Sequence, residues 1–123
     1  MDFRFFKFLT FFFLSFLSSF SQGQTSLVDD AISQVEDVSL KECVAKALES
    51  LDDPRGLLNL YCDSSEFGII RSLEGIQQFE NLAGLGLDNH DINDLSPLLD
   101  LSSLSVLGIL NSGIADVSVL GEL

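Results

Sequence analysis

The sequence LAGLGLDNHDINDLSPLLDL, residues 82–101, returns 22 residues later as LSVLGILNSGIADVSVLGEL, residues 104–123. Eight positions match in residue or in type without a gap, from Leu82 and Leu104 at the start to Leu101 and Leu123 at the end. The shared unit reads LxxLxLxxxxIxDLxxLxxL. A fixed period of this length indicates a solenoid, in which each coil buries its apolar edge only against its neighbours.

Each unit has the pattern of a short strand followed by a loose helical return. Leu85 and Leu87 lie two residues apart, so both point to one face of an extended strand. Asp94 is predicted to cap the return turn, as Asp116 does one unit later, and Ser96 is predicted as an N-cap before a helical proline. Apolar residues at every third position favour a short 3₁₀ or irregular return: Ile92, Leu95 and Leu98.

This pattern resembles the 22-residue leucine-rich repeat of bacterial internalins and related surface proteins. The strings that carry the likeness are Leu82-Ala-Gly-Leu85-Gly-Leu87 and Ile92-Asn-Asp-Leu95-Ser-Pro-Leu98. The family usually has an asparagine three residues after the last strand leucine, where its side chain bonds the backbone of the turn. Here His90 and Ser112 hold those positions, and Asn89 and Asn111 lie one place earlier. Either the turn is re-registered or the asparagine ladder is missing.

The segment before the repeats is predicted to form a helical cap over residues 24–56. Apolar residues at helical spacing indicate one helix over 25–38. A second helix is expected to begin at Ser39, which fits a capping box with Glu42. Its apolar stripe is Leu40, Cys43, Val44, Ala47, Leu48 and Leu51. Such a cap covers the open end of a solenoid, and the internalin resemblance implies the same arrangement.

Residues 57–123 are predicted to form about three coils, over 57–81, 82–103 and 104–123. The strand residues Leu57, Leu60 and Cys62 precede their counterparts in the next coil by 25 residues, whereas the return residues keep the 22-residue period. The three extra residues therefore lie between Cys62 and Ile70, where we expect a longer surface turn. The fold class is an α/β solenoid, a short leucine-rich repeat horseshoe with an N-terminal helical cap and no C-terminal cap.

Residues 1–23 have the layout of a secretory signal peptide. Two basic residues precede an apolar run over 8–20, and small residues follow it. The run is shorter than the roughly 20 apolar residues that a membrane span needs. Cleavage is expected after Ser21 or Gly23, which makes the protein secreted, periplasmic or cell-surface. The alternative is a retained membrane anchor, which would be the chain's only membrane contact.

The remaining chain is strongly acidic. Removing Asp2, Arg4 and Lys7 lowers the 19 acidic and 6 basic residues to 18 and 4, a formal charge of −14. Such a surface repels phosphate, so no nucleic-acid partner is expected. The acidity is interpreted first as a solubility feature. A preference for basic partners or divalent cations is the alternative.

The two cysteines are predicted to pair. Cys43 lies on the apolar face of the second cap helix, and Cys62 lies at a strand position in the coil that this helix should cover. An even cysteine count in a secreted chain favours a disulfide. Two buried free thiols are the alternative.

No catalytic set, cofactor motif or metal spacing is found in the sequence. His90 is the only histidine, and as a turn residue it is interpreted as structural because no nucleophile lies at a defined spacing from it. The oxygen-rich segment Asp88–Asp94 superficially resembles a calcium loop. It lacks the glycine at the sixth position and the closing glutamate, so no metal is predicted. The protein is not expected to be an enzyme.

The candidate binding surface is the outward side of the strands, which forms the concave face of such a solenoid. It has one aromatic residue and three glycines, so a plain solenoid wall is the alternative interpretation. The candidate residues are Asn59, Tyr61, Asp63, Gly84, Gly86, Asp88, Val106, Gly108 and Leu110.

The resemblance implies a secreted or cell-surface module that binds an unknown, possibly basic protein without catalysis. The alternative is the N-terminal fragment of a longer leucine-rich repeat surface protein with no independent activity. Because the sequence stops on a repeat leucine, we also expect residues 24–123 alone to self-associate through this end or to fray from about Leu104.

Overall fold

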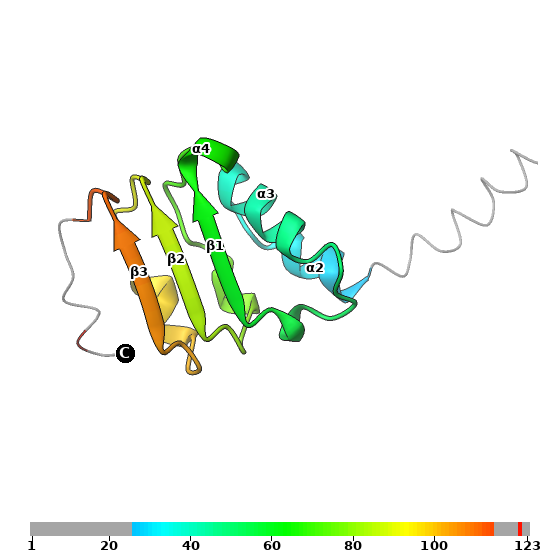
Figure 1. The fold of residues 1–123 in the computed structure, drawn as a ribbon. Helices are drawn as coiled ribbons and strands as arrows, with labels where there is room; N and C mark the ends of the chain where they lie inside the picture. The colour runs from blue at the N-terminus through cyan, green and yellow to red at the C-terminus, as the bar shows by residue number, and fades with distance from the viewer. Residues whose placement is uncertain (1–25, 115–120, 122–123) are drawn as a thin grey trace, which may run out of the picture.

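The computed structural model describes residues 26–114 and Gly121 (Figure 1). The predicted signal peptide lies outside the described residues, and so do Asp116, Val117, Leu120 and Leu123 of the last repeat unit. None of the helices in residues 26–114 has the length and apolar character of a membrane-spanning segment.

Three parallel strands form one sheet in the order β1-β2-β3 (Figure 1). β1 spans Asn59–Asp63, β2 spans Gly84–Asp88 and β3 spans Val106–Leu110. Tyr61 pairs with Gly86, and Gly86 pairs with Gly108. These offsets are the 25- and 22-residue shifts of the sequence, so the predicted register is confirmed. Side chains alternate between the core and the outer face in all three strands.

In the first two coils the return side is a short 3₁₀ turn, as the three-residue spacing predicted. η2 spans Ile76–Gln78 and η3 spans Ser96–Asp100. The backbone N–H of Ser96 donates to Asp94 Oδ1 at 2.9 Å. The prediction that Asp94 caps this turn is therefore confirmed, whereas Ser96 is the first residue of the turn and not its N-cap. The apolar residues of these returns fill the core: Ile70, Leu73, Ile76, Phe79, Ile92, Leu95, Leu98 and Leu101.

The helical cap lies against the free edge of β1 (Figure 1). α2 spans Leu27–Ser33, α3 spans Val38–Ala47 and the 3₁₀ turn η1 spans Pro54–Gly56. α2 is shorter than the predicted helix over 25–38. It ends at Ser33, and α3 begins after its N-cap residue, Asp37. Val35 still points into the core, but Val38 is exposed.

Asp37, and not Ser39, caps α3. Its Oδ1 accepts the backbone N–H groups of Ser39 at 2.9 Å and Leu40 at 3.1 Å. Its Oδ2 accepts those of Arg71 at 2.9 Å and Ser72 at 3.3 Å. The predicted capping box was wrong because Asp37 offers two oxygens. One satisfies the first turn of α3, and the other ties this helix to the first coil.

The extra residues of the first coil form a helix, where the sequence predicted only a longer turn. This helix, α4, spans Ser64–Phe67 and packs against α3 (Figure 1). Asp63 starts it by accepting the Ser65 backbone N–H at 2.8 Å. Gly68 ends it with φ 87°, a conformation that favours glycine.

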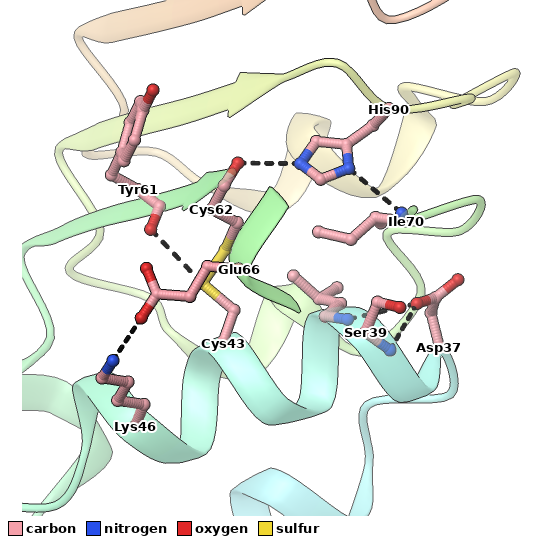
Figure 2. The surroundings of a disulfide bond; sticks show 10 residues. Asp37, Ser39, Cys43, Lys46, Tyr61, Cys62, Glu66, Ile70 and His90 are labelled. Atoms are coloured by element: carbon pink, nitrogen blue, oxygen red, sulfur yellow. Dashed lines mark hydrogen bonds and ion pairs between the residues drawn. A yellow bond between two sulfur atoms is a disulfide. The ribbon is translucent and has the colours of Figure 1, made fainter. Parts of the chain in front are cut away.

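A disulfide joins the cap to the sheet, as predicted. Cys43 of α3 and Cys62 of β1 are both buried, with sulfurs 2.03 Å apart (Figure 2). At a separate contact, the cap approaches the first return turn closely, because a Cβ on Gly75 would lie 2.2 Å from the Gln34 carbonyl oxygen. Gly75 also has φ 99°, so both its backbone conformation and its lack of a side chain are required at this contact.

His90 and Ser112 take the place of the missing asparagines. The Ile70 backbone N–H donates to His90 Nδ1 at 3.1 Å, so the ring proton resides on Nε2, which donates to the Cys62 carbonyl at 2.7 Å (Figure 2). The Ser112 hydroxyl donates to the Leu87 carbonyl at 2.8 Å. Cys62 and Leu87 are register partners, so both side chains bond the same place in successive coils.

Candidate concave binding site

Eight of the nine candidate residues border one open hollow of about 470 Å³ on the outer face of the sheet. Only Asp63 lies outside its lining. The alternation of each strand explains this grouping, since residues two apart share a face. The candidate residues that line the hollow are Asn59, Tyr61, Gly84, Gly86, Asp88, Val106, Gly108 and Leu110.

Tyr61 lies across the neighbouring strand instead of pointing away from the sheet. A Cβ on Gly86 would lie 2.5 Å from Tyr61 Cδ2, so the absence of a side chain at Gly86 makes room for the ring. The Tyr61 hydroxyl donates to Asp88 Oδ2 at 2.8 Å. This bond raises the pKa of Tyr61, because ionising the hydroxyl would break it and place a second negative charge beside the carboxylate.

At the other end of the strands, Asn59 of β1 lies over Gly84 of β2 in the same way. A Cβ on Gly84 would lie 2.4 Å from Asn59 Oδ1. Side chains of β1 therefore cover both glycines of β2, and the middle of the hollow is floored by backbone. The two glycines are required here for space, since neither has a positive φ.

The far side of the hollow is apolar. Val106 is 66% exposed and Leu110 is 64% exposed, and both lie on β3 with Gly108 between them. Large apolar side chains that gather beside a hollow mark interaction surfaces more often than single scattered ones.

A second hollow, of about 230 Å³, lies on the opposite side of Tyr61. It is bordered by Asn59, Leu60 and Tyr61 of β1 and by residues of the cap. Lys46 of α3 forms an ion pair with Glu66 of α4 at its rim, which raises the pKa of Lys46 (Figure 2). The Lys46 ammonium also lies 5.5 Å from the ring centre of Phe67. Its cap residues are Cys43, Lys46, Ala47, Glu66 and Phe67.

This second hollow was not predicted from the sequence. Its outer wall is α4, which was predicted as a surface turn. The only signal of α4 in the sequence was the three-residue insertion. This signal was ambiguous, because an extended loop and one helical turn fit the same length. Asp63 was assigned to the concave face, but its Oδ1 accepts the Ser65 N–H and, at 2.7 Å, the Ser65 hydroxyl. These bonds lower the pKa of Asp63 and commit this oxygen to capping α4.

The site offers hydrogen-bonding, charged and apolar contacts. Both ring nitrogens of His90 are bonded to backbone groups, so this histidine has no free nitrogen for proton transfer. Among residues 26–114, no group of three or more His, Cys, Asp or Glu side chains is placed to hold a metal ion. Within the same part, every buried side-chain nitrogen or oxygen has a hydrogen-bond partner.

Solved structures of two internalins have a fold similar to that of this chain. An internalin, InlF, from Listeria monocytogenes str. 4b F2365 matches with a TM-score of 0.66 and 27% identity, over 76% of this chain and 29% of that protein. Internalin C2 of the same organism matches with a TM-score of 0.65 and 26% identity, over 76% of this chain and 43% of that protein. Neither a protein-family model nor a curated protein matches the chain.

The chain is thus structurally similar to internalins, and its fold is a short leucine-rich repeat with three parallel strands and accompanying helices. The resemblance and the fold class inferred from the sequence are confirmed. The chain spans less than half the length of either internalin structure.

Proposed function

We propose that this chain is a non-catalytic leucine-rich repeat module that binds another protein through its concave face, outside the cytoplasm. The observation that carries this proposal is the paired hollow around Tyr61, with exposed Val106 and Leu110 at one side. Tyrosine is enriched among the residues that dominate binding energy, and a solenoid presents its concave face as one continuous surface.

In this proposal residues 1–23 direct export, residues 24–56 cap the stack and residues 57–123 supply the repeats. The disulfide supports export, because such bonds persist mainly in oxidising compartments. The internalin similarity supports an interaction role over a catalytic one.

The second candidate is that the chain is the N-terminal part of a longer leucine-rich repeat surface protein. The observation in its favour is length, since the chain matches 29% and 43% of the two internalins. In that case the concave face described above is one portion of a longer one. Sequencing the messenger RNA past codon 123 distinguishes the two candidates.

Site-specific cross-linking tests the binding role. A photoreactive phenylalanine analogue replaces Tyr61 or Val106 in the producing cell, and exposed Leu99 on the return turn serves as the control position. We expect one discrete cross-linked partner from the two concave positions and none from Leu99. Equal cross-linking at all three positions, or none at Tyr61 and Val106, would contradict the proposal.

A further inference from the structure

We infer that the concave face takes an extended, cationic segment of the partner, with an apolar side chain on β3 and a basic side chain against Tyr61. This inference rests on the proposed function and names the chemistry of its partner. Three observations support it: the net charge of the chain, the ion pairs that its own basic residues already make, and the order of side chains across the sheet.

The charge of the chain favours a cationic partner. The formal net charge is −13, and the predicted mature chain retains four basic residues. Two of these are already paired in the structure, Lys46 with Glu66 and Arg55 with Asp53. The surrounding field therefore attracts cations and repels anions, which steers encounter and selects against acidic partners.

The local arrangement at Tyr61 has the same preference. Asp63 and Asp88 are register partners, so acidic residues end both strands; Asp88 borders the hollow, whereas Asp63 caps α4. The Tyr61 ring lies next to Asp88 and is 60% exposed. One side of the ring is turned to Gly86, and an exposed aromatic surface beside the Asp88 carboxylate suits a guanidinium or ammonium group.

The apolar part of the concave face lies on β3, on the far side of β2 from Tyr61. In register, Tyr61 is followed by Gly86 and then Gly108, which lies between Val106 and Leu110. Strands are spaced by about 4.8 Å, so β1 and β3 are separated by about 10 Å. A segment that crosses the strands in extended form places alternate side chains roughly 7 Å apart on one side. The Tyr61 ring extends from β1 over Gly86 of β2, so it lies closer to β3 than the β1 backbone does. A leucine over β3 and an arginine two residues away, against the ring, fit this shorter distance.

Synthetic peptides provide the probe. The first is a 12-residue peptide that repeats Ser-Leu-Ser-Arg, the second has glutamate for arginine, and the third has alanine for leucine. Binding to the exported protein is measured by fluorescence anisotropy at low salt and at about 0.15 M salt, where charges are screened beyond roughly 8 Å. We expect the leucine–arginine peptide to bind most tightly, the alanine peptide more weakly and the glutamate peptide not at all.

Variants separate recognition by the face from general attraction to an acidic protein. Val106→Ser with Leu110→Ser keeps the charge, and Asp88→Asn removes one charge at the site. The matched controls on the return turn are Leu99→Ser and Asp100→Asn, which change exposed residues of the same types. We expect about tenfold weaker binding or more for the site variants, a loss typical of central contacts, and less than twofold for the controls.

Equal weakening by Asp88→Asn and Asp100→Asn, or no effect of the serine pair, would overturn the inference and reduce the binding to non-specific charge attraction. The absence of any peptide binding would overturn it as well. The serine pair tests the inference even if Asp88→Asn unfolds, because Val106 and Leu110 are exposed. If the cross-linked partner contacts Tyr61 through a neutral or acidic segment, this inference fails while the proposed function stands.

Discussion

The second and third coils have nearly the same sequence pattern but differ in burial. Leu85 and Leu87 of the second coil are 2% and 0% exposed, whereas Leu107 and Ile109, their partners in the third coil, are only partly buried. Leu82 and Ile92 are fully buried, and their counterparts Leu104 and Ile114 again are not. The difference shows that the repeat sequence supplies the apolar side chains, while neighbouring coils determine how much of each is removed from water.

The first coil is covered by different means. The cap replaces a preceding coil and is held by three kinds of contact: the Cys43–Cys62 disulfide, the Asp37 carboxylate and the close approach at Gly75. In the described part of the chain, the third coil packs against a neighbour on one side only. Stability is therefore expected to fall from the cap side of the stack towards β3.

Alanine substitutions at matched positions of the second and third coils should show this stability gradient most strongly. Leu85→Ala removes a side chain packed on all sides, and we expect a loss of about 3–5 kcal/mol in the free energy of unfolding. Leu107→Ala removes its partly exposed counterpart, and we expect about 1–2 kcal/mol. Urea denaturation followed by circular dichroism measures both. Equal losses would mean that burial in the structure does not determine the energetics.

Removing the disulfide should have the next largest effect. The bond closes a loop of 19 residues in sequence separation, and in the chain-entropy model such a loop contributes about 3 kcal/mol. The double variant Cys43→Ala, Cys62→Ala should lose this amount and still fold, because both positions lie in an apolar core. Denaturation with and without reductant provides the check. A variant as stable as the oxidised protein would show that the cap is held by packing alone.

The main architecture was predictable because it repeats. Strand positions, register and inward side chains all follow from the 22-residue period, and the return turns follow from apolar residues at every third position. Features that occur only once in the chain were not predictable from the sequence. Asp37 and Ser39 are both good N-caps in sequence, and only the approach of residues 71–72 selects Asp37. The burial of His90 depends on the position of Ile70, after a helix that the sequence did not reveal.

Asp37→Ala should weaken the contact between the helical cap and the first coil, and so lower the free energy of unfolding. The variant loses four hydrogen bonds from backbone N–H groups to one carboxylate, two within α3 and two from the loop at 71–72. We expect a loss of about 2 kcal/mol, within the range for N-cap removal and for bonds to a charged group. Ser39→Ala is the control and should have little effect. If Ser39→Ala costs more than Asp37→Ala, the assignment of the cap is wrong.

The smallest expected effect is a pH dependence at the exposed end of the cap. Arg55 donates hydrogen bonds to Asp53 and lowers the pKa of its carboxyl from 3.8 to about 2. Since the folded-state pKa is depressed, the contribution of this pair to stability is complete above about pH 4 and is lost as the pH falls towards 2. The stability difference between wild type and Asp53→Asn should shrink over this window. Asp52→Asn provides the control, and a difference independent of pH would contradict the assignment.

Hydrogen exchange of the strand amides tests the stability gradient most directly. It reports local opening residue by residue, so the same position is compared in successive coils of the wild-type protein. The Gly84 and Val106 amides are register partners, and each donates to the preceding coil at 3.0 Å. We predict that the Gly84 amide exchanges at least about tenfold more slowly than that of Val106, a difference of roughly 1.4 kcal/mol in opening free energy. Equal protection at these two amides would contradict the claim that neighbouring coils determine stability in this stack.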